Sequence, residues 1–236
     1  MLVSHRRRFI FLKTSKTGGT SVESYFEREC LPAGEWECSH FRDETVSAAG
    51  IIGYRGWNMP ADCCWWNHMP AAEVRVKLGE EVWSTYFKFT VVRNPFDKTV
   101  SAFYFDSPIE PGTRFDSQRE QRRFERWLES SPPWTDRDKY LIDGQLCVNH
   151  LIRYESLQAD LADVCRRLQI PWEPNRLPRF KAGMRPPEAT VTSLFSPRSR
   201  QMVEETYAWE FENFGYSFPG TSTTLSTLTS RDRHVA

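Results

Sequence analysis

Short apolar segments alternate with amphipathic, helix-like segments through most of the chain. Three runs have the length and the aromatic or β-branched composition of buried strands, and they span 9–12, 86–92 and 146–154. Each is followed by a pattern of apolar residues with helical spacing. Strands that alternate with helices are typical of an α/β fold, so we expect a single domain with a central, mostly parallel sheet and helices on both faces.

The segments between these strands have less regular patterns, from which we predict further elements. They are a helix near 42–49, a strand near 51–54, a short buried strand over 63–68, and helices over 71–78, 118–129 and 196–214. We assign residues 1–219 to the domain. The Ser/Thr-rich segment 220–236 is expected to be disordered.

The junction between the first strand and the helix after it has the composition of an anion site. The chain turns through 13–21 and continues as a predicted helix over 22–29. A helix N-terminus presents backbone N–H groups that lack partners inside the helix, and it carries partial positive charge. Glycines allow a ligand to approach the backbone, and hydroxyls and a lysine add donors. The candidate phosphate ligands are Lys16, Thr17, Gly18, Gly19, Thr20 and Ser21.

Two other interpretations of this loop are an ordinary turn and a nucleoside-triphosphate loop. An ordinary strand-to-helix turn with a solvated lysine would have a similar composition. The loop differs from the nucleoside-triphosphate loop, GxxxxGK[ST], because Lys16 precedes Gly18 instead of following the second glycine. A phosphate site is therefore favoured, and an ordinary ATPase or GTPase is not.

A second phosphate site is predicted where the strand over 86–92 ends. Arg93 follows the strand directly, and Pro95 cannot continue a strand ladder but suits the first turn of a helix. Ser101 lies about one and a half turns into that helix. A guanidinium and a hydroxyl that converge from one junction can bind a phosphate, although a surface ion pair would also explain the arginine.

His68 is the candidate general base. It lies between a predicted strand and the helix over 71–78, where α/β folds place site residues. Its ordinary pKa is near neutrality, so it could accept a proton from a hydroxyl. A histidine that caps the helix or bonds a backbone carbonyl is the structural alternative, and His40 and Glu37 are reserve candidates for the base.

The two junctions together resemble the donor-binding motifs of carbohydrate-type sulfotransferases, which use 3′-phosphoadenosine-5′-phosphosulfate (PAPS). KTGGTS at 16–21 is similar to the 5′-phosphosulfate loop of that family, and RNPFDKTVS at 93–101 is similar to its 3′-phosphate motif. The two motifs also occur in the family's order, and the resemblance covers roughly residues 8–218. Lys13 and Ser15 stand where a histidine and a proline are frequent, which indicates a divergent member.

The resemblance implies a P-loop-like fold and transfer of a sulfuryl group from PAPS to an acceptor, with 3′-phosphoadenosine 5′-phosphate (PAP) released. The acceptor would be a hydroxyl, or as second choice an amine, of a saccharide or a small natural product. Lys16 would act on the leaving group, while Arg93 and Ser101 would bind the 3′-phosphate.

Two later segments are also implicated by the resemblance. The basic loop over 177–185 is similar to a loop that reaches back over the donor, which makes Lys181 and Arg185 candidate contacts. Trp134 lies in a segment that lines the acceptor side in the family. A solvated loop and a surface tryptophan are the alternatives.

Composition narrows the class of protein. The 31 basic and 31 acidic side chains balance, which argues against a general nucleic-acid binder. No run approaches ~18 consecutive apolar residues, so we expect no membrane span. The six cysteines lack zinc-ligand spacing, and no metal is expected. Together with the resemblance, this favours a cytoplasmic, bacterial enzyme.

Two other functions stay open on the sequence alone. A kinase or other nucleotide phosphotransferase is one, although the position of Lys16 and the lack of an obvious magnesium-binding carboxylate after a second strand argue against it. A non-catalytic nucleotide-binding module is the other, because nine tryptophans could form a surface that docks a partner protein. Neither the acceptor nor the oligomeric state can be predicted from these patterns.

Overall fold

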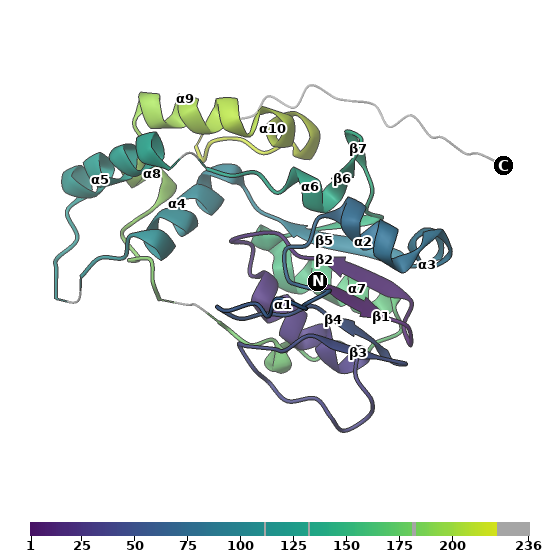
Figure 1. The fold of residues 1–236 in the computed structure, drawn as a ribbon. Coiled ribbons are helices and arrows are strands. Elements are labelled where there is room, and N and C mark those ends of the chain that lie inside the picture. The colour runs from purple at the N-terminus through teal and green to yellow at the C-terminus, as the bar shows by residue number, and fades with distance from the viewer. Residues whose placement is uncertain (111, 132, 181–182, 221–236) are drawn as a thin grey trace.

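Six strands form the central sheet within the described part of the chain, in the order β3-β4-β1-β2-β5-β8 (Figure 1). The computed structural model describes residues 1–110, 112–131, 133–180 and 183–220. The sheet strands are β1 (Leu2–Ser4), β2 (Phe9–Leu12), β3 (Thr45–Ser47), β4 (Gly50–Ile52), β5 (Phe87–Val92) and β8 (His150–Arg153), and a separate hairpin pairs β6 (Leu141–Ile142) with β7 (Gln145–Leu146). The segment over 221–236, expected to be disordered, lies outside the described residues.

The helices confirm the alternating pattern of the sequence. They are α1 (Gly19–Phe26), α2 (Ala71–Leu78), α3 (Glu80–Thr85), α4 (Pro95–Asp106), α5 (Ser117–Ser130), α6 (Arg137–Tyr140), α7 (Leu157–Arg167), α8 (Val191–Leu194), α9 (Pro197–Thr206) and α10 (Ala208–Phe214). The α/β class with helices around a central sheet is therefore confirmed.

Strand direction places the two predicted phosphate junctions at one edge of the sheet. β2 pairs with β5, and β5 pairs with β8, both in parallel. β1 pairs antiparallel with both β2 and β4, and β3 pairs antiparallel with β4, so four of the six strands in the described sheet run in one direction. Because β2 and β5 are parallel neighbours, the loops that follow them begin side by side.

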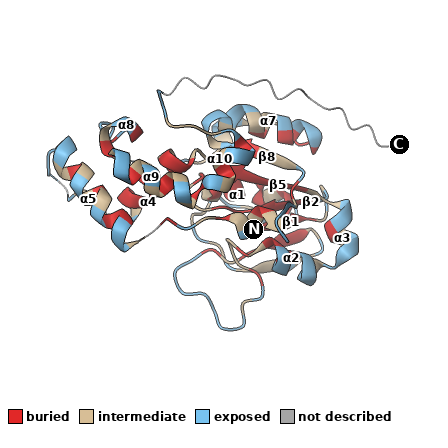
Figure 2. Ribbon diagram, turned by 90° about the horizontal axis from the view of Figure 1, so that it is seen from above, coloured by how far each residue is buried: buried red, intermediate tan, exposed pale blue. Residues whose placement is uncertain are grey.

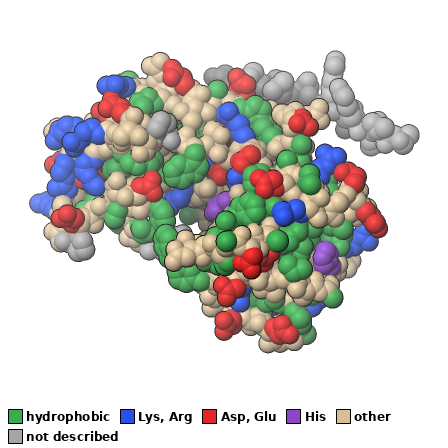
Figure 3. Space-filling view, viewed as in Figure 1, with side chains coloured by type: hydrophobic (Ala, Val, Ile, Leu, Met, Phe, Trp, Pro, Cys, Tyr) green, Lys and Arg blue, Asp and Glu red, His purple; other side chains and the backbone are tan. Residues whose placement is uncertain are grey.

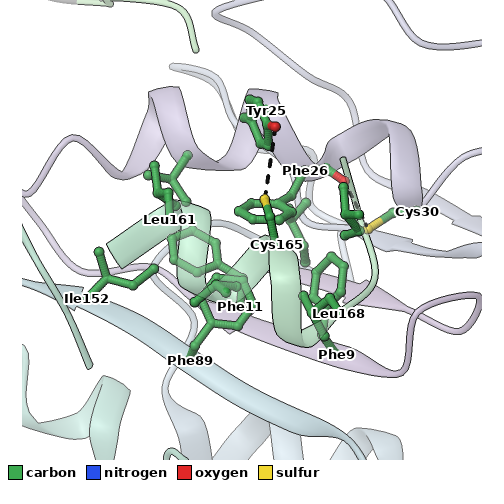
Figure 4. Packing of buried hydrophobic residues seen from close by; sticks show 14 of the residues in the cluster. Phe9, Phe11, Tyr25, Phe26, Cys30, Phe89, Ile152, Leu161, Cys165 and Leu168 are labelled. Atoms are coloured by element: carbon green, nitrogen blue, oxygen red, sulfur yellow. Dashed lines mark hydrogen bonds between the residues drawn. The ribbon is translucent and has the colours of Figure 1, made fainter. Parts of the chain in front are cut away.

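Alternate side chains of β2 build two separate cores. Phe9 and Phe11 point to the face covered by α1 and α7, whereas Ile10 and Leu12 pack with residues of α2, α3 and α10 on the other face. Figure 4 shows the first core, in which phenylalanines from β2, β5 and α1 pack under α7. In Figure 2 strands β1 and β2, most of β5 and the inward sides of the helices are buried, while the outer sides of the helices are exposed.

A third core lies outside the sheet, in a group of helices that we call the helical lobe: α4, α5, α8 and α9. Figure 1 shows this lobe beside the sheet rather than over its face. Phe96 and Phe103 of α4 pack there with Phe124 of α5 and Val203 of α9. The lobe begins directly after β5, so its first helix carries the second predicted phosphate motif.

Three sequence-based predictions of secondary structure are wrong. The segment 42–49 contains β3 instead of a helix, because pairing with β4 overrides a weak helical pattern. The segment 63–68 is irregular apart from a bridge between Trp66 and Tyr54, and its buried Trp65 packs without belonging to a strand. The final helix is two helices, α9 and α10, which meet at Tyr207.

Among the described residues, no helix is both long enough and apolar enough to cross a bilayer.

A cluster of buried charges lies beneath the loop after β2. The Glu23 carboxylate is 2.6 Å from the Lys13 Nζ, 2.9 Å from the Arg55 Nη1 and 2.6 Å from the amino group of Met1. All four residues are buried. Burial alone would raise the pKa of Glu23, but the Lys13 ammonium and the other cations outweigh it and hold the pKa well below its ordinary range.

Replacing Glu23 with glutamine is expected to destabilise the fold by roughly 3–5 kcal/mol, because the buried cations lose their compensating charge. Urea unfolding at pH 7 measures this difference. Glu81→Gln, at an exposed position of α3, is the matched control and should change stability by less than about 0.5 kcal/mol. Equal effects of the two substitutions would show that the cluster does not stabilise the fold.

Candidate functional site

The loop after β2 enters α1 through two glycines that the backbone requires. Gly18 has a φ of 74°, in the left-handed region that side chains disfavour. A Cβ at Gly19 would lie 2.8 Å from the Lys13 Cγ, which is closer than such atoms approach. The first turn of α1 contains no acidic side chain, so its N–H groups and partial positive charge favour an anion.

The hydroxyl residues of this loop divide into two groups. Thr20 and Ser21 line a cleft at the start of α1. Thr17 is buried, and its hydroxyl bonds the side chain of Thr14 at 2.9 Å and donates to the Thr14 carbonyl at 3.2 Å. The Thr17 side chain therefore shapes the loop and does not line the cleft.

Lys16 combines an unusual backbone with a defined side-chain position. Its φ is 59°, which is uncommon for any residue other than glycine. Its Nζ lies 3.7 Å from the ring centroid of Phe105, a residue of α4, in a cation–π contact. Both residues line the same cleft, so the ammonium is held at the boundary between the loop and the helical lobe.

Arg93 reaches from the end of β5 to the loop over 13–21, which we call the phosphate loop after its predicted ligand. Its Nη1 donates to the carbonyl of Lys16 at 2.8 Å, and its Nε and Nη2 contact the Asp97 carboxylate at 2.7 and 2.6 Å. Contacts to described residues thus engage three of the five guanidinium N–H groups. Ser101, two turns into α4, lines the same cleft as Arg93.

The late basic loop meets this junction at Asp97. Arg185 Nη1 lies 2.5 Å from Asp97 Oδ1, so Asp97 joins Arg185 to Arg93. Burial tends to raise the pKa of Asp97, but the two guanidinium groups hold that pKa below its ordinary value. The structure therefore brings Arg185 to the second junction, whereas Lys181 lies outside the described residues.

His68 stands at the cleft with a defined tautomer. Its backbone φ is 58°, and its Nδ1 lies 3.2 Å from the carbonyl oxygen of Lys13. A carbonyl can only accept, so Nδ1 carries the proton and Nε2 keeps its lone pair. Burial, with a smaller effect of the Lys13 ammonium, lowers the pKa of His68 to about 4. The neutral ring can act as a proton acceptor through Nε2.

The two reserve candidates for the base lie farther from this arrangement. The ring of His40 packs edge-on against Phe180, a residue of the cleft wall, at 5.3 Å between centroids. Glu37 is exposed, and its backbone carbonyl accepts from Arg42. Neither side chain lines the cleft, whereas His68 does.

The cleft itself lies between the sheet-bearing part and the helical lobe, where the surface in Figure 3 is hollowed. It is open to solvent, and its cavity volume is about 300 Å³. Its lining combines the loop, both junctions and several aromatic rings: Lys13, Thr14, Ser15, Lys16, Gly18, Gly19, Thr20, Ser21, His68, Arg93, Ser101, Phe105, Trp134, Tyr154 and Phe180. Trp134, expected on the acceptor side, is about half exposed here.

Sequence reasoning missed Asp136, whose side chain contacts the backbone of the phosphate loop at Ser15. Its carboxylate accepts from the Ser15 N–H and pairs with the buried Lys98 of α4. The one available signal was an aspartate placed directly before a short helix, a position that ordinarily indicates only a helix cap.

The His68 ring is expected to stay neutral, with its proton on Nδ1, from pH 8 down to about pH 5, because its pKa is lowered to about 4. Nitrogen-15 NMR of the imidazole measures both the tautomer and the titration. A His68→Asn variant assigns the signal. Titration near the ordinary value of ~6.5 would show that burial does not suppress the charge.

Comparison with known proteins gives one finding. A family model described as the sulfotransferase family matches residues 1–217 of the 236-residue chain. Searches of curated proteins and of solved structures gave no match. The matched region contains the phosphate loop, the Arg93 junction and His68, and the match supports a sulfotransferase activity. The chain belongs to the sulfotransferase family.

Proposed function

We propose that the protein transfers a sulfuryl group from PAPS to a hydroxyl, or as second choice an amine, of a saccharide or small natural product. The observation that carries this proposal is that three separate segments contribute to one cleft. They are the loop over 13–21, the junction over 93–101 and His68. The sequence predicts a different role for each: binding of the 5′-phosphosulfate, binding of the 3′-phosphate, and general base.

The two ends of the donor would bind at two helix N-termini. The N–H groups at the start of α1, with Lys16, Thr20 and Ser21, suit the 5′-phosphosulfate. The remaining N–H groups of Arg93, with Ser101, suit the 3′-phosphate. Arg185 would add charge at that end through its position on Asp97.

The reaction follows from this placement of charge. The acceptor oxygen attacks sulfur, and the bond between sulfur and the bridging oxygen of the 5′-phosphate breaks. Negative charge then develops on that bridging oxygen, where the Lys16 ammonium and the α1 amides would stabilise it. The products are the sulfated acceptor and PAP, and the proton of the acceptor hydroxyl must leave.

His68 is the proposed acceptor of that proton. Its Nε2 lone pair is available because Nδ1 donates to the Lys13 carbonyl. A pKa of about 4 makes the ring a weak base by itself. Negative charge from a bound donor would raise this pKa, since a nearby anion favours the charged imidazolium.

The walls of the cleft suggest the class of acceptor. Phe105, Trp134 and Phe180 present aromatic rings, and no carboxylate side chain is found among the described residues of the lining. The charged side chains among those described residues are Lys13, Lys16 and Arg93, which belong to the loop and the second junction. A saccharide ring or an aromatic natural product could pack on these aromatic faces. A screen of acceptors with radiolabelled PAPS would identify the product.

PAP is expected to bind about 10- to 100-fold more tightly than 5′-AMP, because the 3′-phosphate gains charge-assisted hydrogen bonds. Titration calorimetry measures both affinities. Ser101→Ala should reduce the preference without abolishing binding. Equal affinities for PAP and AMP, or tighter binding of ATP with Mg²⁺ than of PAP, would contradict the proposed donor and favour a phosphotransferase.

Lys16→Ala is expected to lower kcat by about 100- to 1,000-fold, since a preorganised donor on the leaving group is lost. His68→Ala should lower kcat by about 100- to 10,000-fold while PAP affinity is kept. Steady-state PAP release in the presence of an active acceptor measures both. Lys77→Ala, at an exposed position of α2, is the control. Wild-type turnover in either variant would remove that residue from the mechanism.

A further inference from the structure

Asp136 is buried at a position where its side chain has an unexpected partner. It precedes α6 directly, and aspartate at such a position usually accepts from the N–H groups of the helix. Here the side chain makes no such bond. Both carboxylate oxygens instead accept from the Ser15 N–H, at 3.0 and 3.1 Å. The carboxylate therefore binds the backbone of the phosphate loop instead of capping α6.

The orientation of that carboxylate is fixed from its other side. The Lys98 Nζ lies 2.5 Å from Asp136 Oδ2, and both residues are buried. Lys98 also lies over the ring of Tyr207, at 5.3 Å from the centroid, and the Tyr207 hydroxyl donates to the backbone carbonyl of Trp134. Packing and charge thus hold Asp136 in place independently of the loop that it contacts.

Lys16 lies between two such contacts. On its N-terminal side Asp136 holds the Ser15 N–H, and on its C-terminal side Arg93 donates to the Lys16 carbonyl at 2.8 Å. Between these contacts the Lys16 backbone is left-handed, with a φ of 59°. A non-glycine residue keeps such a conformation only where its surroundings enforce it.

Ser15 makes the first of these contacts possible. A proline at this position would have no backbone N–H to donate. With serine at this position, the N–H needs a buried acceptor, and Asp136 supplies it.

We propose that Asp136 is a positioning residue for Lys16: it holds the Ser15 N–H so that the strained backbone presents the ammonium to the cleft. This inference rests on the proposed role of Lys16 at the leaving group. Asp136 also follows Trp134 by two residues, so the segment that holds the loop continues into the aromatic wall of the cleft. Residues 134–136 thus contact the proposed donor loop through Asp136 and line the proposed acceptor side of the cleft through Trp134.

The test uses a charge-neutral pair of substitutions, because Asp136→Ala alone would leave Lys98 buried without its counter-charge. Asp136→Ala with Lys98→Met removes both charges. Total PAP formation from PAPS is measured with a fixed mixture of p-nitrophenol and neutral methyl glycosides, so transfer and hydrolysis both count. Thermal unfolding and calorimetry with PAP are measured on the same samples.

The pair is expected to lower kcat by about 30- to 100-fold while PAP affinity changes by less than about 5-fold. In a Lys16→Ala background the pair should cost less than about 2-fold, because a residue that acts through Lys16 has nothing left to position. The control is Glu210→Gln. Glu210 is a buried carboxylate that borders the same pocket as Asp136 but bonds Arg137 and Tyr140, and its variant should change kcat by less than about 3-fold.

The outcomes separate this inference from the proposed function. A wild-type chain that forms no PAP from PAPS would overturn the proposed function itself. An active wild type in which the pair costs no more than Glu210→Gln would overturn the role of Asp136. The same follows if the losses from the pair and from Lys16→Ala multiply, since multiplication indicates independent effects.

Should the pair fail to unfold cooperatively, Asp136→Asn in the Lys98→Met background repeats the comparison. Near-wild-type kcat is expected for this variant because the amide oxygen of asparagine can still accept from the Ser15 N–H.

Discussion

The left-handed backbone of Lys16 is the constraint on which the site depends. It lets the chain leave β2, present an ammonium to the cleft and still enter α1 through Gly18 and Gly19. Such a conformation is unfavourable for lysine, so the surrounding residues must supply the free energy that maintains it. Two hydrogen bonds reach this backbone from elsewhere in the fold: Asp136 accepts from the Ser15 N–H and Arg93 donates to the Lys16 carbonyl, and neither residue is adjacent to Lys16 in the sequence.

Buried charge supports the loop from beneath as well. Glu23 pairs with Lys13 and Arg55 at the start of the loop, and Asp136 pairs with Lys98 while it accepts from the Ser15 N–H. Desolvation makes each of these charges costly by itself, and pairing offsets the cost. Paired buried charges therefore adjoin a short, polar loop, an arrangement that would suit the electrostatic preorganisation of the proposed reaction.

The topology explains why distant segments share one cleft. β2 and β5 are parallel neighbours, so their following loops lie at one edge of the sheet, and both loops lead into helices. α4, the first helix of the helical lobe, then contributes Phe105 to the cleft, and the segment between α5 and α6 contributes Trp134. His68 joins the cleft through an irregular segment whose hydrogen bond to Lys13 fixes the ring.

The sequence alone determined the elements with strong local patterns and the residues of the two junctions. β2, α2 and α4 have clear periodicity or strong start signals, and Lys16, Arg93 and Ser101 follow from chemistry at strand–helix junctions. His68 was predicted at the end of a strand that the structure does not contain, yet its side chain lines the same cleft. Tertiary structure decided the rest. The β3 strand exists only through pairing with β4, and the irregular 63–68 segment is held by packing. Asp136 looks like a helix cap locally, and its contact with Ser15 depends on chain folding across 121 residues, which no local pattern encodes.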